Sequence, residues 1–392
     1  MGNKEKEGKS MKRITASILL LSLIFLSSCS NIEIVELNER LIIEAIGIDY
    51  ENGIYKVTIE GLDSFSAGTE SNSISAPSLT KCYLFEGETI GMAMNSISVI
   101  TGQIPLFSQA RILILGFYAA TEKLSEILDF FRREYTTRTD ILFAVAKNTA
   151  AEIVSADFGK NISAGSILQA AILSYKHTGR NTYTPLYRFI NSVMGDTDSS
   201  FCPVIDIKDN AYKNGKEVSL TGTAVFGKDK SAVIISPEMT LGLMLITGEI
   251  RNGDITVKTD KGTATIEIID SKVRMRTEIV DGKAHFNLKL RIRCDIPEFQ
   301  SEHFRGLSKS DTEIIAQHSA EKVSGILSDT LNEVFYKYNY DAFGIGRRIN
   351  LKNHGFYEEI INNNIKLSDV VSFDIEAKIE IRRIGKIILA EE

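Results

Sequence analysis

Residues 41–61 have the sequence LIIEAIGIDYENGIYKVTIEG, and this segment decides how the first part of the chain folds. It contains two apolar, β-branched runs, residues 41–48 and 54–61, on either side of Asp49-Tyr50-Glu51-Asn52-Gly53. An Asn-Gly pair between two such runs is a strong local signal for a tight turn, because both residues tolerate positive φ. The segment therefore predicts a β-hairpin.

Beyond the hairpin, strands and helices alternate up to about residue 175. Residues 64–80 are rich in Ser, Gly and Thr without periodicity, which is typical of an exposed loop. Apolar runs predict strands, and apolar residues at helical spacing predict helices. We expect strands at 82–86, 111–117 and 141–146, and helices at 89–100, 121–131 with Thr121 as N-cap, 149–156 and 163–175. This alternation is typical of a mixed α/β unit.

The rest of the chain favours hairpins and an antiparallel sheet. Residues 218–226 and 231–235 flank a Gly-Lys-Asp turn and predict a second hairpin. Pro237 opens a helix that Gly248 closes. This helix is nearly apolar all round, so it is either buried or offers a face to a membrane partner.

Alternating patterns dominate the last third of the sequence. Four antiparallel strands are expected, at 255–257, 263–269, 273–279 and 284–294, with a final strand at 369–388. Between them, Ser310-Asp311-Thr312-Glu313 is a capping-box pattern for a long helix whose apolar stripe includes Val323, Leu327, Leu331, Val334 and Tyr338. The predicted fold class is α+β, or mixed α/β, with antiparallel and mixed sheets packed by helices.

Residues 11–29 have the three parts of a secretory signal. Met11-Lys12-Arg13 precedes an apolar run at 14–26, and small residues precede Cys29. The run is short for a membrane span, which needs about 20 residues. Leu26, Ser27, Ser28 and Cys29 resemble the lipobox of bacterial lipoproteins, where the cysteine sulfur receives a diacylglyceryl group before cleavage.

We therefore expect residues 1–28 to be a lipoprotein signal peptide, with translation starting at Met1 or Met11. Cys29, as an N-palmitoyl and S-diacylglycerol cysteine, would then fix the chain to the outer face of a membrane. The alternative is a single-pass anchor that contains a cysteine by chance.

Composition excludes some classes of protein. The 392 residues carry a formal charge of −6, and the residues after Ser28 hold 40 Lys/Arg against 49 Asp/Glu. An acidic body makes a broad nucleic-acid-binding surface improbable. Cys29, Cys82, Cys202 and Cys294 show none of the short spacings typical of zinc or redox motifs, and the sequence leaves open whether any two of the last three form a disulfide.

No catalytic or metal-binding motif stands out. The five histidines form no HExxH pair, and His318 lies in the long predicted helix, where packing or exposure explains it. Gly344-Ile345-Gly346 lacks the third glycine and the preceding strand of a dinucleotide-binding loop, so it predicts a turn. The sequence contains no GxSxG elbow and no P-loop. We expect no metal, no cofactor and no enzymatic activity.

Four further stretches occur in a definite order behind the predicted lipidation site. They are Glu36-Leu37-Asn38 with Ala45-Ile46-Gly47-Ile48-Asp49, then Leu220-Thr221-Gly222-Thr223-Ala224-Val225-Phe226, then Phe343-Gly344-Ile345-Gly346, and finally Ile379 to Gly385. In this order they resemble the C subunit of bacterial spore germinant receptors, the Ger(x)C lipoprotein family. The sequence departs from the family in one respect: Ser30-Asn31 follows the cysteine where members often carry Trp-Asp, and no tryptophan is present.

The resemblance implies a three-domain lipoprotein on the outer face of the spore inner membrane. The domains would span 29–200, 201–252 and 253–392, with the hairpin 41–61 packing against the middle one. The protein would act in spore germination without catalysis, together with two integral-membrane receptor subunits, A-type and B-type. A free-standing solute-binding surface lipoprotein is the alternative from a different class, and ligand screening of the protein without partners separates the two.

Overall fold

The predicted hairpin forms the start of the folded chain. A computed structural model describes residues 39–62, 80–134, 136–159, 162–195, 199–211, 215–250, 252–301, 307–385 and 387–388. Strands β1 (Arg40–Glu51) and β2 (Ile54–Leu62) pair antiparallel, with Glu51 opposite Ile54. Asn52 and Gly53 both have positive φ, 52° and 84°, as the Asn-Gly turn requires. The hairpin is confirmed.

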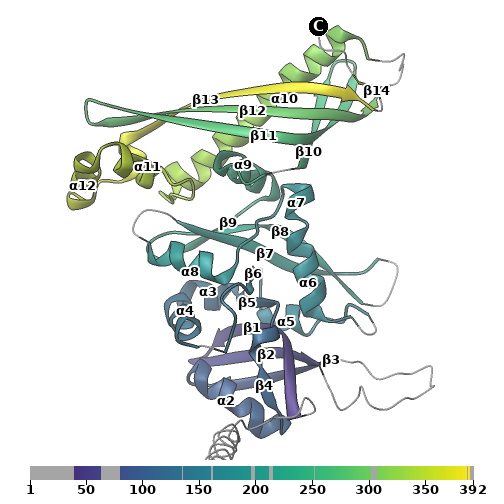
Figure 1. The fold of residues 1–392 in the computed structure, drawn as a ribbon, viewed down its shortest axis with the longest axis vertical. Coiled ribbons are helices and arrows are strands. Elements are labelled where there is room, and N and C mark those ends of the chain that lie inside the picture. The colour runs from purple at the N-terminus through teal and green to yellow at the C-terminus, as the bar shows by residue number, and fades with distance from the viewer. Residues whose placement is uncertain are drawn as a thin grey trace, which may run out of the picture. The chain divides into compact units, whose positions relative to one another are not determined.

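A nine-stranded mixed sheet grows from this hairpin within the described residues (Figure 1). Its order is β3-β2-β1-β5-β6-β7-β8-β9, and β4 pairs with β1 away from that path. The contacts β1–β5, β5–β6 and β6–β7 are parallel, and the pairs toward both edges are antiparallel. The further strands are β3 (Thr80–Gly87), β4 (Ile104–Leu106), β5 (Ile112–Gly116), β6 (Leu142–Ala146), β7 (Ser200–Asp209), β8 (Lys216–Phe226) and β9 (Ala232–Ile235). Strand β7 was not predicted.

Helices cover both faces of this sheet, because its central strands are apolar on both sides. Leu113 and Phe143 join the core with one set of helices, whereas Ile112 and Ala144 join the core on the opposite face. The first set is α2 (Ile90–Thr101), α3 (Phe117–Glu122), α4 (Leu124–Arg133) and α8 (Leu186–Met194). The second set is α5 (Ala150–Val154) and α6 (Ala164–Leu173), and the short helix α7 (Tyr175–Thr178) follows α6. Two helix-covered faces give this part of the chain three layers.

One predicted cap is wrong. The chain becomes helical already at Phe117, so Thr121 lies inside α3, where its hydroxyl donates to the Phe117 carbonyl at 3.2 Å. Helix α4 begins after Lys123 instead.

Helix α9 (Pro237–Thr247) settles the alternative left open for the apolar helix. It begins at a Ser236 N-cap and ends at Gly248, with φ 74°. Every residue from 240 to 246 is buried, within a core that also includes strands of the second sheet. Core burial therefore explains the apolar helix.

The second sheet has the order β10-β11-β12-β13-β14 among the described residues. Its strands are β10 (Gly253–Thr259), β11 (Gly262–Val280), β12 (Lys283–Gln300), β13 (Val371–Ile384) and β14 (Ile387–Ile388). One expectation was wrong. Residues 263–279 form one strand rather than two, because bulges near Glu267 and Asp270 absorb the change in pattern without ending the strand. The sequence left the pairing of the final strand open: β12 and β13 pair parallel, because the helices between them return the chain to the end of the sheet at which β12 starts.

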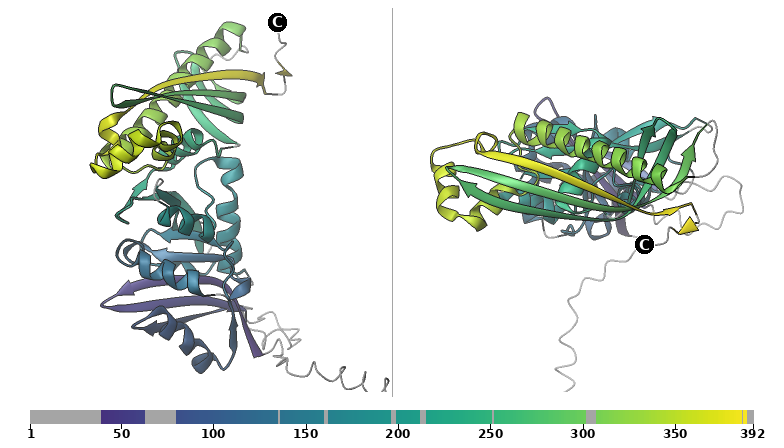
Figure 2. Two further views of the ribbon diagram at one scale, coloured as in Figure 1. Left: turned by 60° about the vertical axis from the view of Figure 1, so that its left-hand side comes forward. Right: turned by 90° about the horizontal axis from the view of Figure 1, so that it is seen from above.

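Helix α10 (Lys309–Thr330) runs along one face of this sheet (Figure 2). Its capping box joins Ser308 to Asp311, two residues before the predicted pair, and Lys261 also contacts the Asp311 carboxylate, which favours this start. The chain continues as a π-helical stretch, Leu331–Lys337, and then as three helices that the sequence did not predict: α11 (Ile345–Lys352), α12 (His354–Asn362) and α13 (Leu367–Val370).

The structure is α+β with mixed sheets, as predicted. Strands β7 to β9 continue the sheet that β1 begins, and β5 and β6 lie between the hairpin 41–61 and β7. The division into domains at residues 200 and 252 stays a prediction.

Candidate functional site

The predicted anchor, Cys29 with Leu26, Ser27 and Ser28, lies outside the described residues. Its lipidation stays a prediction.

The other three cysteines are free thiols. Cys82 is exposed on β3, and its thiol donates to the Val154 carbonyl at 3.4 Å. Cys202 and Cys294 are buried, and burial raises the pKa of Cys202 and raises that of Cys294 to about 12. A thiol with so high a pKa is a poor nucleophile at neutral pH, so the two buried cysteines behave as apolar core residues.

The turn predicted at Gly344-Ile345-Gly346 holds only for Gly344, because Ile345 and Gly346 are the first residues of helix α11. Gly344 has φ 70° and is the N-cap residue. The Asp341 carboxylate accepts hydrogen bonds from the amides of Phe343, Ile345 and Gly346, at 3.3, 2.8 and 2.6 Å. Asp341 is only 4% exposed. A buried carboxylate thus replaces the backbone partners that the first amides of every helix lack.

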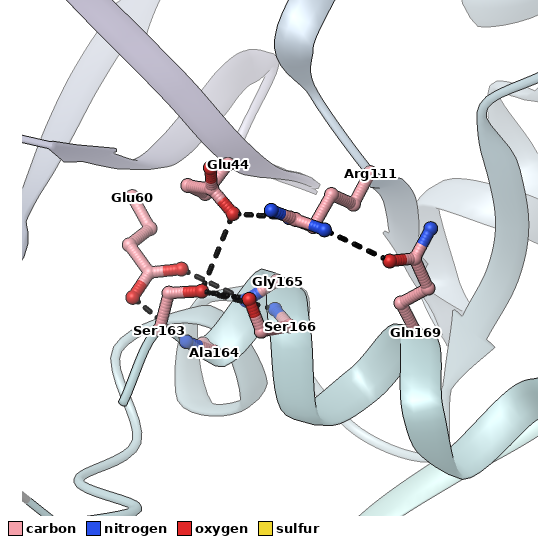
Figure 3. A network of polar contacts seen from close by, with 8 residues as sticks. All are labelled: Glu44, Glu60, Arg111, Ser163, Ala164, Gly165, Ser166 and Gln169. Carbon is pink, nitrogen blue, oxygen red and sulfur yellow. Dashed lines mark hydrogen bonds and ion pairs between the residues drawn. The ribbon is translucent and has the colours of Figure 1, made fainter. Parts of the chain in front are cut away.

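A second buried carboxylate caps α6 (Figure 3). Glu60 on β2 is 2% exposed and accepts hydrogen bonds from the amides of Ala164 and Gly165, at 2.7 and 2.9 Å. Burial raises its pKa, and the two amides partly offset that effect. The close approach of α6 to β1 needs a glycine at position 165, because a Cβ there would lie 2.5 Å from the Glu44 carbonyl oxygen.

Next to this cap, Glu44 on β1 forms an ion pair with Arg111, and hydrogen bonds from this pair reach α6 and its N-cap residue Ser163 (Figure 3). Its carboxylate, 5% exposed, pairs with Arg111 and accepts a bond from the Ser163 hydroxyl at 3.3 Å. Arg111 in turn donates to the Gln169 side chain at 3.0 Å. The guanidinium and hydroxyl supply the partners that a buried carboxylate needs.

Asp49, the last residue of the motif Ala45–Asp49, caps α5. It accepts from the amides of Ala150 and Ala151 at 2.8 and 2.9 Å, and burial raises its pKa. Gly116 leaves the room for this carboxylate, since a Cβ there would lie 2.0 Å from it.

These buried acids therefore hold helices against strands. Their oxygens are engaged by backbone amides, a hydroxyl or a guanidinium, so their burial and the raised pKa values of Glu60 and Asp49 need no catalytic explanation. The sequence shows these acids only as isolated Asp and Glu residues inside apolar runs. That pattern is itself a signal for a buried, partnered charge.

A polar cleft of about 380 Å³ lies between α8, the start of β7 and the start of α11. Its lining contains three arginines and one carboxylate, Glu249. Arg188 of α8 pairs with Glu249, one of the contacts at 3.4 Å. The other two arginines, Arg347 and Arg348, lie on α11. Arg188 and Arg348 are 160 positions apart along the chain, so the sequence does not show that they line one cleft.

Two features are absent from the residues that the structure describes. No group of three His, Cys, Asp or Glu side chains there could hold a metal ion. No helix in that part of the chain is long and apolar enough to cross a membrane.

Comparison with known families decides what kind of protein carries this architecture. The model of the spore germination protein N-terminal domain matches residues 33–207, and the model described as spore germination B3/GerAC like, C-terminal, matches residues 221–385. The chain belongs to the Ger(x)C family of spore germination proteins.

Individual relatives of this Ger(x)C protein are distant in sequence. It is 21% identical over 285 residues to spore germination protein GerQC of Bacillus cereus, covering 72% of this chain and 75% of the relative. It is 20% identical over 378 residues to spore germination protein B3 of Bacillus subtilis, covering 95% of this chain and 98% of the relative. The crystal structure of the GerBC protein has the same fold, with a TM-score of 0.56 at 17% identity, over 86% of this chain and 96% of that one.

Three of the motifs that carry the family resemblance have structural roles in this Ger(x)C protein, whereas Glu36-Leu37-Asn38 lies outside the described residues. Gly47 packs against α5, where a Cβ would lie 3.1 Å from the Ala150 side chain. Gly222 has φ 141°, and a Cβ there would meet the Ile235 carbonyl oxygen at 2.0 Å. Together with the Gly344 turn, these positions fix how helices and strands approach one another.

Proposed function

We propose that this Ger(x)C protein is the C subunit of a spore nutrient germinant receptor. It is anchored by lipid at Cys29 on the outer face of the spore inner membrane, and it acts through protein contacts without catalysis. The observation that carries the proposal is the order of the two family matches, which together span residues 33–385 apart from 208–220. A chain that matches both halves of the family in sequence is suited to the family's role as a whole.

The anchor follows from the signal segment that ends at Cys29. Each buried methylene of an acyl chain contributes about 0.8 kcal/mol, so an S-diacylglycerol group with an N-palmitoyl chain gives far firmer attachment than one chain. Cleavage before Cys29 leaves the acidic body of the protein outside the membrane, attached at its first residue.

Attachment matters because the proposed partners, an A-type and a B-type integral-membrane subunit, lie in the same membrane. Confinement to one surface replaces a bimolecular encounter by one at high effective concentration, which favours assembly without any additional contact. In this proposal the body supplies contact surfaces, and germinant sensing is a property of the assembled receptor.

Replacement of the anchoring cysteine tests the proposal. Spores that carry Cys29→Ala should contain the protein in the soluble fraction rather than the membrane fraction, and they should germinate poorly on nutrients. Cys82→Ala, which removes an exposed free thiol, is the matched control and should behave as wild type. Normal membrane retention together with a normal nutrient response in Cys29→Ala spores would refute the anchored-subunit proposal.

A gene deletion tests the receptor role separately from the anchor. Spores without the protein, in a strain without a redundant paralogue, should fail to respond to at least one nutrient germinant. They should still germinate with a non-nutrient trigger that bypasses receptors. Wild-type responses to every nutrient would exclude the receptor role.

A further inference from the structure

The C-terminal end of helix α2 carries exposed apolar side chains. Val99 is 85% exposed, the most exposed large apolar side chain among the described residues, and the adjacent Ile100 is 65% exposed. Ile104, the first residue of β4, is 47% exposed. Apolar residues exposed singly are common on protein surfaces, whereas neighbouring ones are characteristic of surfaces that contact a partner or a membrane. We call Val99, Ile100 and Ile104 the apolar tip.

The apolar tip lies in the longest uncharged stretch of the sequence. Residues 89–110 contain no Lys, Arg, Asp or Glu, although charged residues make up 24% of the chain. The solvent-facing side of a surface helix normally carries charged or polar groups. On α2 the exposed residues besides the tip are Met92, Asn95 and Ser98, none of which is charged. This composition suits contact with an uncharged, apolar environment.

Local hydrogen bonds hold the end of α2 in a fixed conformation. The Thr101 hydroxyl donates to the Ile97 carbonyl at 2.7 Å and accepts from the Gln103 amide at 3.2 Å. Gly102 ends the helix with φ 68°, and its amide donates to the Ser98 carbonyl at 3.0 Å. Strand β4 follows directly, and α2 packs against it (Figure 1). The apolar tip is therefore preformed, so little ordering is needed when it docks.

The apolar tip lies at the end of the nine-stranded sheet where β1 begins. Strand β5 runs parallel to β1 from Ala45 on, and only five residues separate β4 from β5, so β4 pairs with β1 near its first residues. In the proposed function Cys29 is lipidated, and the eleven residues 30–40 then link it to Leu41. Such a segment spans at most about 40 Å when fully extended. The anchor therefore keeps this end of the sheet near the membrane.

We propose that the apolar tip docks on the lipid surface of the membrane that holds the anchor, with Val99, Ile100 and Ile104 at the boundary between headgroups and acyl chains. This inference rests on the proposed lipidation of Cys29. The anchor makes docking an intramolecular step, so a small apolar surface suffices. A stable protein interface instead buries about 800 Å² per partner, far more than three side chains offer. Docking directs this end of the sheet toward the membrane.

A single tryptophan tests the docking, because the chain contains none. Val99→Trp places the reporter in the apolar tip, and Leu351→Trp, at an 84% exposed position of α11, is the matched control. Each lipidated protein is reconstituted in neutral phosphatidylcholine vesicles and compared with its Cys29→Ala form free in solution. The emission of Val99→Trp should shift to shorter wavelength on the vesicles and be quenched by brominated lipid, whereas that of Leu351→Trp should not change. Raised NaCl should leave the shift intact, because no charged group takes part.

A charged substitution and vesicle flotation separate docking from anchoring. Ile100→Asp in the Val99→Trp protein should abolish the shift and the quenching, whereas Leu351→Asp should preserve both. Protein that floats with the vesicles but shows no shift overturns the docking alone, and protein that does not float refutes the anchor and the docking with it. An emission already shifted in the soluble Cys29→Ala form would overturn the docking, because another part of the chain then covers the tip. A shift in spore membranes but not in pure lipid would overturn it in favour of a protein partner.

Discussion

Replacement of Asp341 by Ala should destabilise the C-terminal part of the protein strongly, because this one carboxylate satisfies the start of α11. It accepts from three backbone amides at 3.3, 2.8 and 2.6 Å and is 4% exposed. Ile345, which follows the Gly344 turn, is fully buried, so water cannot readily replace the lost partner.

The size of the effect follows from these contacts. A hydrogen bond to a charged group contributes about 1.5 to 3 kcal/mol net, and the 3.3 Å contact is the weakest of the three. Removal of a buried charge offsets part of the loss, because its desolvation cost also disappears. We expect the free energy of unfolding to fall by about 3 kcal/mol in Asp341→Ala, and by about half of that in Asp341→Asn, which keeps one acceptor oxygen.

Urea unfolding followed by circular dichroism measures the global change, and hydrogen–deuterium exchange of the peptide 341–352 measures the local one. Exchange at Ile345 and Gly346 should accelerate most. Asp374→Ala is the matched control, because this aspartate is exposed on β13 and forms no ion pair with a described residue. Its effect should stay within about 0.5 kcal/mol. An Asp341→Ala protein as stable as the Asp374→Ala control, with unchanged exchange in that peptide, would refute the role assigned to Asp341.

Two further predictions concern a glycine and a buried acid. Gly222→Ala should lower the free energy of unfolding by about 3 kcal/mol or more, since the new Cβ would meet the Ile235 carbonyl oxygen at a backbone φ of 141°. The control Gly325→Ala, on open helix surface, should instead raise the free energy of unfolding by up to about 1 kcal/mol. Equal melting temperatures for the two variants would contradict this prediction. Glu60 has a raised pKa, so the stability it contributes is complete below its ordinary value of 4.5 and is lost as pH rises through the folded-state pKa. The melting temperature of Glu60→Gln relative to wild type should therefore increase between pH 4 and pH 7. The control Glu376→Gln should show the opposite trend, because Lys289 lowers the pKa of the exposed Glu376 carboxylate. A constant difference between Glu60→Gln and wild type across that range would rule out the role assigned to Glu60.

Local patterns in the sequence predicted those elements whose causes are local. The hairpin at 41–61 depends on an Asn-Gly turn between β-branched runs, and the helix from Pro237 to Gly248 depends on its own cap and stop residues. These signals involve residues a few positions apart, so they are visible without knowledge of the fold. The family resemblance rested on the same kind of short motifs taken in order, and both family matches confirm it.

Where two local solutions were equally good, the sequence was ambiguous. Ser308 and Ser310 are each followed three residues later by an acid, and the structure uses Ser308, where Lys261 also reaches the acid. Thr121 has the residue type of an N-cap but lies within a helix that starts earlier. In both cases a neighbouring residue or element decided between similar local energies.

The sequence by itself determined the class of protein, the principal strands and helices, and a predicted lipid anchor at Cys29. Only the tertiary structure decided that Glu60 and Asp49 are helix caps, and that Arg188 and Arg348 line one cleft. The physical reason is distance along the chain. A carboxylate and the amides it caps can be 100 residues apart, and guanidinium groups on two helices gather charge only after sheets and helices have packed.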